Sequence, residues 1–262
     1  MRCGRLVAHD RIFMQFTKFS RTGLTVSRLC LGTGTFGKQT DEAESFRVFD
    51  KAADAGVNFI DTADVYPGGA DLPDVGRAEE ITGLWLKGKR NRFLLGTKAG
   101  LPMGSSPWER GSSRKHLLDA IDASLRRLNT DYVDLYQLHM DDPATPLDET
   151  AEALDAIIRS GKARYIGVSN FLAYRLARAI GRQDTLRLVR FVSVQPRYNL
   201  LFGEDDPRDD ELFWFRWDQR VPHLLGGRAR QMNADVGRPA KSPPRLWITP
   251  GWLPSSPSPS FS

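Results

Sequence analysis

The chain has 262 residues, of which 40% are hydrophobic and 26% charged, as expected of a folded globular protein large enough to bury a core. The net charge of +5 is modest and the Lys and Arg residues are scattered, so nucleic-acid binding is not expected. No apolar run is long enough to span a membrane and no secretory signal is recognisable. We therefore expect a cytoplasmic protein without membrane contact, with Cys3 and Cys30 reduced.

The two ends of the sequence differ from its middle. Residues 1–13 precede a second methionine and are expected to be an extension without a structural role. The segment QFTKFSRTGLTVS that follows predicts an N-terminal β-hairpin, with its turn near Arg21, Thr22 and Gly23. Residues 204–262 form a divergent tail, and its low-complexity end, the last ten or more residues (LPSSPSPSFS), is expected to be disordered.

Six repeats of one pattern occupy the middle of the chain, each with a short apolar run, a polar loop and an amphipathic segment. The apolar runs are RLCLGTG, VNFIDTA, RFLLGTK, YVDLYQLH, ARYIGVSN and FVSVQ, which begin near residues 28, 57, 92, 132, 163 and 191. Their spacing is that of βα units. Strands that alternate with helices predict a parallel sheet covered by helices, either as an open doubly wound sheet or as a closed (β/α)8 barrel.

Capping residues predict where two of the helices begin and end. Thr40 is expected to cap a helix that ends at Gly56. Thr145 is expected to cap a second helix, with Pro146 as its first residue, and Gly161 to end it. The expected buried positions, at helical spacing, are Phe46, Phe49 and Ala53 in the first helix, Leu117, Ile121, Leu125 and Leu128 in a helix between the two, and Leu147, Ala151, Leu154 and Ile158 in the second.

The stretch GTGTFG, residues 32–37, has the glycine spacing of a dinucleotide-binding turn, and an acidic residue, Asp61, follows it. Such a turn leads directly into a helix whose free N–H groups meet the phosphates. Here KQT intervenes, and the helix opens with Asp41, Glu42 and Glu44, whose charges would repel a pyrophosphate. The stretch is better explained as the loop after the first strand of a barrel, and a Rossmann dehydrogenase is the least favoured interpretation.

Polar side chains stand at the carboxyl ends of five consecutive predicted strands. They are Asp61 and Tyr66, Lys98, His139, Ser169 and Asn170, and Gln195. Each residue alone is more often solvated or structural. Because the carboxyl ends of parallel barrel strands meet at the face where active sites form, the whole set predicts a catalytic site.

Four of these residues have complementary chemistry. A free tyrosine, with a pKa near 10, is a poor acid at neutral pH, but a neighbouring ammonium stabilises its phenolate. Lys98 is expected to supply that ammonium to Tyr66, with Asp61 keeping the lysine charged and in place. A neutral His139 could orient a carbonyl oxygen by a hydrogen bond. This set suits hydride transfer from a nicotinamide to a carbonyl, and no metal site is expected.

The chain resembles the aldo-keto reductase family over about residues 14–202. The resemblance is carried by SRLCLGTGTFG, GVNFIDTADVY, LLGTKAG, DYVDLYQLH, GKARYIGVSNF and VQPRYNLL, in order and at family-like spacing. It implies a (β/α)8 TIM-type barrel that binds NADP(H) and reduces aldehydes or ketones to alcohols. It implies Tyr66 as proton donor, with Asp61, Lys98 and His139 completing the catalytic set. The implied cofactor-binding residues are Gly32, Thr33, Asp61, Ser169, Asn170 and Gln195.

The resemblance stops near residue 203. The last two strands of the family pattern, with the groups for the pyrophosphate and the 2′-phosphate, are not recognisable beyond it. We therefore expect residues 14–203 to form about six βα units of a C-terminally truncated or altered barrel, with weakened NADP(H) binding and impaired or absent activity. There are two alternatives. One is a non-catalytic binding or regulatory subunit, similar to the potassium-channel β-subunits of this family, and the other is a truncated product without function.

Overall fold

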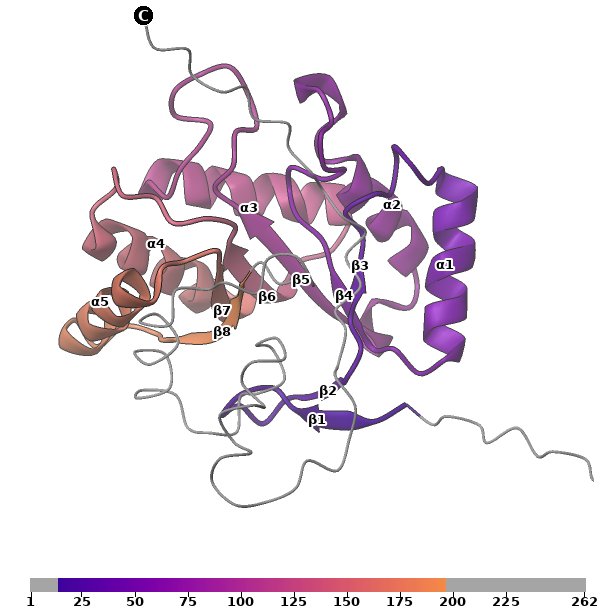
Figure 1. Ribbon diagram of the computed structural model, residues 1–262, viewed down its shortest axis with the longest axis horizontal. Helices are drawn as coiled ribbons and strands as arrows, with labels where there is room; N and C mark the ends of the chain where they lie inside the picture. The colour runs from indigo at the N-terminus through magenta and orange to yellow at the C-terminus, as the bar shows by residue number, and fades with distance from the viewer. Residues whose placement is uncertain (1–13, 197–262) are drawn as a thin grey trace, which may run out of the picture.

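A computed structural model describes residues 14–196 (Figure 1). The expected extension 1–13, the end of the expected barrel portion (197–203) and the expected tail 204–262 lie outside the described residues. The described part opens with β1 (Phe16–Lys18) and β2 (Thr25–Ser27), which pair antiparallel and confirm the predicted hairpin.

The remaining strands form one parallel sheet. They are β3 (Leu31–Gly32), β4 (Phe59–Asp61), β5 (Leu94–Ala99), β6 (Val133–Leu138), β7 (Ala163–Ser169) and β8 (Phe191–Gln195). The connecting helices are α1 (Glu42–Asp54), α2 (Arg77–Leu86), α3 (Arg114–Leu128), α4 (Leu147–Arg159) and α5 (Ala173–Thr185), with short 3-10 helices at Leu72–Asp74 and Arg90–Arg92.

The strands neighbour one another in chain order, from β3 to β8. This is the order of a (β/α) barrel wall, because a doubly wound sheet reverses its strand order part-way. The described residues thus form a six-stranded half-barrel with an N-terminal hairpin, which confirms the predicted fold class. Among these residues no helix is long and apolar enough to cross a lipid bilayer.

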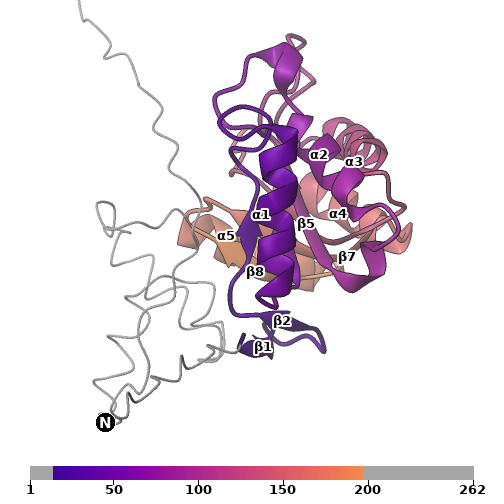
Figure 2. The same ribbon diagram turned by 90° about the vertical axis from the view of Figure 1, so that its right-hand side faces the viewer.

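Side-chain alternation along the strands produces two apolar layers. One lies between the sheet and the helices that surround its outer face in Figures 1 and 2, and it includes Phe49, Leu95, Tyr136 and Leu154. The other lies on the inner face, where Phe19, Val26, Phe59 and Leu135 are buried together. Since Phe19 and Val26 come from the hairpin segment, the hairpin covers the amino ends of the strands and leaves the carboxyl ends to the polar side chains.

The predicted buried positions of the helices pack against the core, but two predicted caps are wrong. Asp41 caps α1 by accepting a 2.7 Å hydrogen bond from the Glu44 N–H, in place of Thr40. A carboxylate suits this position because it also interacts with the positive end of the helix dipole. At α4 the N-cap is Pro146, and the Thr145 hydroxyl instead donates to Asp142 Oδ2 at 2.6 Å.

The loop GTGTFG lies between β3 and α1. Gly37 has φ +92°, and a Cβ there would lie 2.6 Å from the Cγ of Arg77, so only glycine fits. A Cβ at Gly34 would contact the Tyr66 ring at 3.7 Å. The loop thus brings backbone close to one of the predicted catalytic side chains.

Candidate active site

Asp61 and Lys98 form a buried ion pair on the inner face of the sheet. The Lys98 Nζ atom lies 2.6 Å from Asp61 Oδ2 and also donates to the Thr62 carbonyl at 3.0 Å. The two side chains are only 1% and 5% exposed. Burial, the largest influence, acts to lower the pKa of Lys98, but attraction to Asp61 and Tyr66 outweighs it and raises the pKa above its ordinary value. Lys98 is therefore an ammonium ion in the folded chain at neutral pH.

Tyr66 and His139 lie beside this pair. The Lys98 Nζ atom is 5.1 Å from the centre of the Tyr66 ring. The Tyr66 and His139 rings pack edge to face, with their centres 5.6 Å apart. Tyr66 follows β4 and His139 follows β6, so the carboxyl ends of three neighbouring strands bring all four predicted catalytic residues together.

His139 is neutral in the folded chain. Burial, reinforced by the Lys98 charge, lowers the pKa of its imidazole to about 3. Its Nδ1 atom is buried without a hydrogen-bond partner among the described residues. A neutral imidazole carries one N–H, so His139 can offer one hydrogen bond to a carbonyl oxygen without transferring charge.

Ser169, Asn170 and Gln195 lie together at the ends of β7 and β8. Asn170 Nδ2 donates to Ser169 Oγ and to the His139 carbonyl, each at 3.0 Å. The Ser169 hydroxyl donates to the Gln195 carbonyl at 2.8 Å. The Gln195 side chain points toward the predicted catalytic residues, because its Nε2 atom donates to Asp61 Oδ2 at 3.2 Å.

Gly32 and Thr33 lie at the end of β3. Gly32 pairs in register with Asp61. Thr33 is buried, and both its backbone N–H (3.0 Å) and its hydroxyl (3.4 Å) donate to the Asp61 carbonyl. The first-strand loop is therefore fixed to the strand that carries Asp61.

Gln137 belongs to the site, although the strand-end motif does not identify it. It is buried on β6, and its Nε2 atom donates to Asp61 Oδ1 at 3.3 Å and to Gln195 Oε1 at 3.4 Å. Side-chain alternation was the available signal, since Gln137 is two residues before His139 and such positions share a face of a strand.

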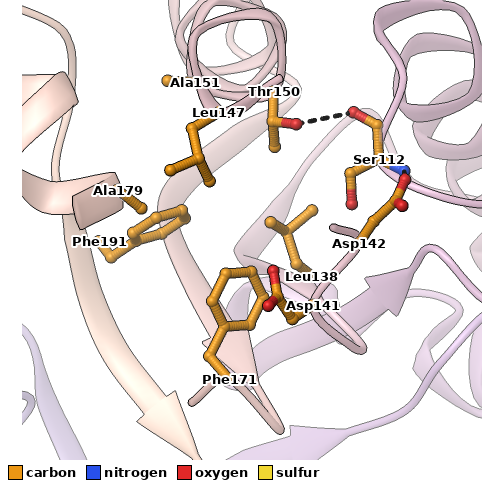
Figure 3. A pocket seen from close by; sticks show the side chains of 10 residues that line it. All are labelled: Ser112, Leu138, Asp141, Asp142, Leu147, Thr150, Ala151, Phe171, Ala179 and Phe191. Atoms are coloured by element: carbon orange, nitrogen blue, oxygen red, sulfur yellow. Dashed lines mark hydrogen bonds between the residues drawn. The ribbon is translucent and has the colours of Figure 1, made fainter. Parts of the chain in front are cut away.

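A separate cavity lies between the sheet and the helices, where Leu138, Leu147, Phe171 and Phe191 meet (Figure 3). Its volume is about 10 Å³, close to the minimum for one water molecule. Ser112 borders it, with its carbonyl accepting a 3.1 Å hydrogen bond from the Thr150 hydroxyl. None of the predicted site residues lines this cavity, and it is too small for an organic substrate.

Within residues 14–196, no group of three His, Cys, Asp or Glu side chains is placed to hold a metal ion.

Two buried carboxyl groups, those of Asp64 and Glu79, lie close enough to repel each other. Glu79 is fully buried but well paired, accepting from Thr97 Oγ1 at 2.5 Å and from Arg127 Nε at 2.7 Å. Asp64 is also fully buried, and no side chain within residues 14–196 donates a hydrogen bond to its carboxyl, which has only a weak contact with the Val65 backbone N–H. Burial, followed by repulsion from Glu79, raises the pKa of Asp64 well above its ordinary value.

Asp64→Asn is expected to stabilise the protein at neutral pH by about 1–3 kcal/mol, because the amide cannot ionise, whereas burial and Glu79 oppose ionisation of the carboxyl at about 1.4 kcal/mol for each unit by which its pKa is raised. Because the folded-state pKa of Asp64 is raised, its carboxyl favours folding below the ordinary pKa and loses that contribution as pH rises. The gain should therefore shrink as the pH falls toward about 4. Urea unfolding across this range measures it, with the exposed Asp131→Asn as control. Equal stability changes in the two variants would contradict the prediction.

The sequence profile described as "Aldo/keto reductase family" matches residues 28–213. The chain belongs to the aldo/keto reductase family. Aldo/keto reductases generally use a nicotinamide cofactor and a small-molecule substrate, so membership supports a general oxidoreductase role.

Three relatives illustrate the range of this aldo/keto reductase family. "Uncharacterized oxidoreductase YrpG" of Bacillus subtilis (strain 168) is 39% identical over 84% of this chain and 71% of its own length. "Aldo-keto reductase YhdN" of the same organism is 37% identical over 82% and 62%, respectively. "Probable voltage-gated potassium channel subunit beta" of Arabidopsis thaliana is 38% identical over 71% and 56%. The alignments thus cover from just over half to 71% of the relatives' lengths.

Proposed function

We propose that this chain carries the catalytic centre of an NADP(H)-dependent reductase that converts aldehydes or ketones to alcohols. One observation carries the proposal: a buried, charged Lys98 paired with Asp61 lies 5.1 Å from the centre of the Tyr66 ring. The His139 ring packs against the same tyrosine. A phenol beside a fixed ammonium is an acid able to protonate an oxygen as it gains negative charge.

The donor set beside this centre fits a nicotinamide carboxamide. Asn170 is exposed at the carboxyl end of β7, and its Nδ2 atom donates to the Ser169 hydroxyl at 3.0 Å. Hydroxyl and amide groups can both donate to and accept from a carboxamide. We propose Ser169, Asn170 and Gln195 as its ligands, with Gly32 and Thr33 at the adjoining wall.

In the proposed reaction the bound reduced nicotinamide supplies the hydride that the carbonyl carbon accepts. Tyr66 gives its hydroxyl proton to the carbonyl oxygen, which becomes the alcohol. The Lys98 ammonium stabilises the phenolate left on Tyr66, and Asp61 keeps that ammonium in place. The neutral His139 donates a hydrogen bond to the same oxygen and so orients the carbonyl.

We propose a preference for NADP(H), which carries a 2′-phosphate, on the basis of the family resemblance. The cofactor ligands assigned within residues 14–196 all belong to the nicotinamide end. Because the last two strands of the family pattern are not recognisable in the sequence beyond residue 203, we propose that this chain binds NADPH more weakly than a full-length reductase does, with turnover reduced accordingly.

Titration of the purified chain with NADPH and with NADH, followed by cofactor fluorescence, tests the cofactor. Oxidation of NADPH in the presence of a panel of aldehydes and ketones tests the reaction, with the Tyr66→Phe variant as impaired control. We expect carbonyl-dependent oxidation and tighter binding of NADPH than of NADH. Binding as tight as that of a full-length reductase would contradict the weakened-affinity part.

A second candidate function is suggested by the plant relative named as a potassium-channel β-subunit. In this alternative the chain binds a partner protein and the cofactor without rapid turnover. NADPH binding that persists while every carbonyl tested fails to oxidise it would favour this function over the reductase.

A further inference from the structure

Gln137 lies at the centre of the polar layer on the inner face of the sheet. It pairs in register with Lys98 on one side and with Gly167 on the other. Its side chain is buried, with only 3% of the residue exposed. A buried amide in this position must satisfy its donors on neighbouring side chains.

The two carboxylate oxygens of Asp61 accept hydrogen bonds from different donors. Asp61 Oδ2 accepts from Lys98 Nζ at 2.6 Å and from Gln195 Nε2 at 3.2 Å. Asp61 Oδ1 accepts from Gln137 Nε2 at 3.3 Å. An ionised carboxylate can only accept, so both glutamines must turn their NH2 groups toward it. Gln195 then presents its Oε1 atom to Gln137, at 3.4 Å, and every group in the network is consistently oriented.

A glycine on β7 leaves space that this network occupies. A Cβ at Gly167 would lie 3.2 Å from Gln137 Oε1 and only 2.2 Å from Ser193 Oγ. Any side chain at Gly167 would force these neighbouring groups to move, so the glycine is needed for the observed position of the Gln137 amide.

We infer that Gln137 is a positioning residue of the reaction: by donating to Asp61 Oδ1 it fixes the carboxylate with Oδ2 toward Lys98. The Lys98 ammonium is thereby held beside the Tyr66 ring. This inference rests on the proposed function, because it specifies how the side chains of the same site are held in position. Gln137 acts through Asp61 and does not itself contact the substrate.

Gln137→Glu and Gln137→Leu separate this role from simple packing. A glutamic acid, while protonated, can donate one hydrogen bond to Asp61 as the amide does, whereas its ionised form repels the carboxylate. Within residues 14–196, the charged and titratable groups around position 137 are Asp61 from β4, Lys98 from β5, Cys30 before β3, and Tyr66 and His139 at the strand ends. β7 and β8 contribute the uncharged Gly167, Ser193 and Gln195.

The expected result is a pH-dependent defect for one variant only. Burial and the Asp61 charge both oppose ionisation of the carboxyl that Gln137→Glu introduces, so it should stay protonated near pH 5 and ionise toward pH 8. The kcat of this variant should be close to that of the wild-type chain near pH 5 and about tenfold lower near pH 8, the size expected for losing a hydrogen bond to a charged group. Gln137→Leu should be reduced about tenfold at both pH values, because it lacks the donor throughout. The melting temperature of Gln137→Glu should likewise fall, relative to Gln137→Leu, as the pH rises.

Gln183 provides the matched control. It is a fully buried glutamine on α5, and its Oε1 atom accepts from the Phe191 N–H at 3.3 Å, away from the site. Gln183→Glu and Gln183→Leu should lower the melting temperature but leave the pH profile of kcat parallel to that of the wild-type chain.

Two results would overturn the inference: wild-type kcat in Gln137→Leu, or a Gln137→Glu pH profile parallel to that of the wild-type chain. A wild-type chain without any turnover would instead overturn the proposed function, together with the kinetic role of Gln137. In that case the melting temperatures of the variants still test whether Gln137 contacts Asp61. No pH-dependent difference between Gln137→Glu and Gln137→Leu would then show that position 137 does not face the Asp61 charge.

Discussion

Lys98→Met is expected to lower the free energy of unfolding by about 3–5 kcal/mol, because it removes one partner of a buried ion pair and leaves the other charge behind. Of its side-chain partners in the described part of the chain, Asp61 would keep the neutral donors Gln137 and Gln195, at 3.3 and 3.2 Å. Two amide hydrogen bonds do not replace an ammonium at 2.6 Å within the interior. Urea denaturation of the purified chain measures the loss.

The pH dependence of this loss has a defined sign. A lysine whose folded-state pKa is raised contributes stability that is complete below its ordinary pKa and is lost only as the pH rises through the folded value. Both lie above the range of about pH 6–9, so the lysine itself adds no pH dependence there, and the deficit of Lys98→Met should persist to pH 9, where the carboxylate left unpaired is fully charged. A deficit that disappears near pH 9 would contradict the assignment of Lys98 as a charged ammonium.

Two further variants separate the buried pair from charge in general. Lys115→Met removes an exposed lysine that pairs with Asp119 at 2.6 Å, with side chains 62% and 67% exposed, and should cost less than about 1 kcal/mol. Combining Lys98→Met with Asp61→Asn removes both buried charges and should recover much of the stability. A Lys98→Met deficit no larger than that of Lys115→Met would contradict the prediction.

The repeating architecture could be predicted from sequence because each element leaves a local signal. Apolar runs such as RFLLGTK and YVDLYQLH are buried on both faces, and the helices between them carry apolar residues at helical spacing. The caps of α1 and α4 were predicted less well, since Thr40 and Asp41 are adjacent acceptable caps and Pro146 follows an equally plausible Thr145. The choice depends on tertiary contacts such as the Thr145–Asp142 hydrogen bond.

The internal order of the site was harder to predict than its membership. Strand ends identify Asp61 and Lys98, but the Gln137–Asp61 contact joins residues 76 positions apart and the Gln195–Asp61 contact joins residues 134 apart. Such pairings depend on the register of the strands, which no local pattern fixes. Asp64 illustrates the same limit, because in DTADVY it resembles a solvated loop residue, whereas the fold buries it completely.

Tyr66→Phe is expected to reduce carbonyl-dependent NADPH oxidation by about 10²–10⁴-fold, the usual contribution of a positioned general acid. Phenylalanine keeps the ring that packs edge to face on His139 and lies 5.1 Å from Lys98 Nζ. Only the donated proton is lost, so the affinity for NADPH and the melting temperature should stay close to those of the wild-type chain. Steady-state kinetics and a fluorescence titration on the same preparation measure both.

Tyr132→Phe is the matched control for the loss of a tyrosine hydroxyl. The Tyr132 ring lies 4.3 Å from the guanidinium of Arg90 and 4.3 Å from that of Arg164, just before β6 and therefore at the opposite end of the strands from Tyr66. Its kcat should equal that of the wild-type chain. If Tyr66→Phe also retained wild-type kcat, Tyr66 could not be the proton donor. The Lys98 ammonium held by Asp61 would then have to assist a different proton donor. If kcat fell together with NADPH affinity, Tyr66 would instead act in binding, because a group that works only as the reaction proceeds lowers kcat without weakening the cofactor complex.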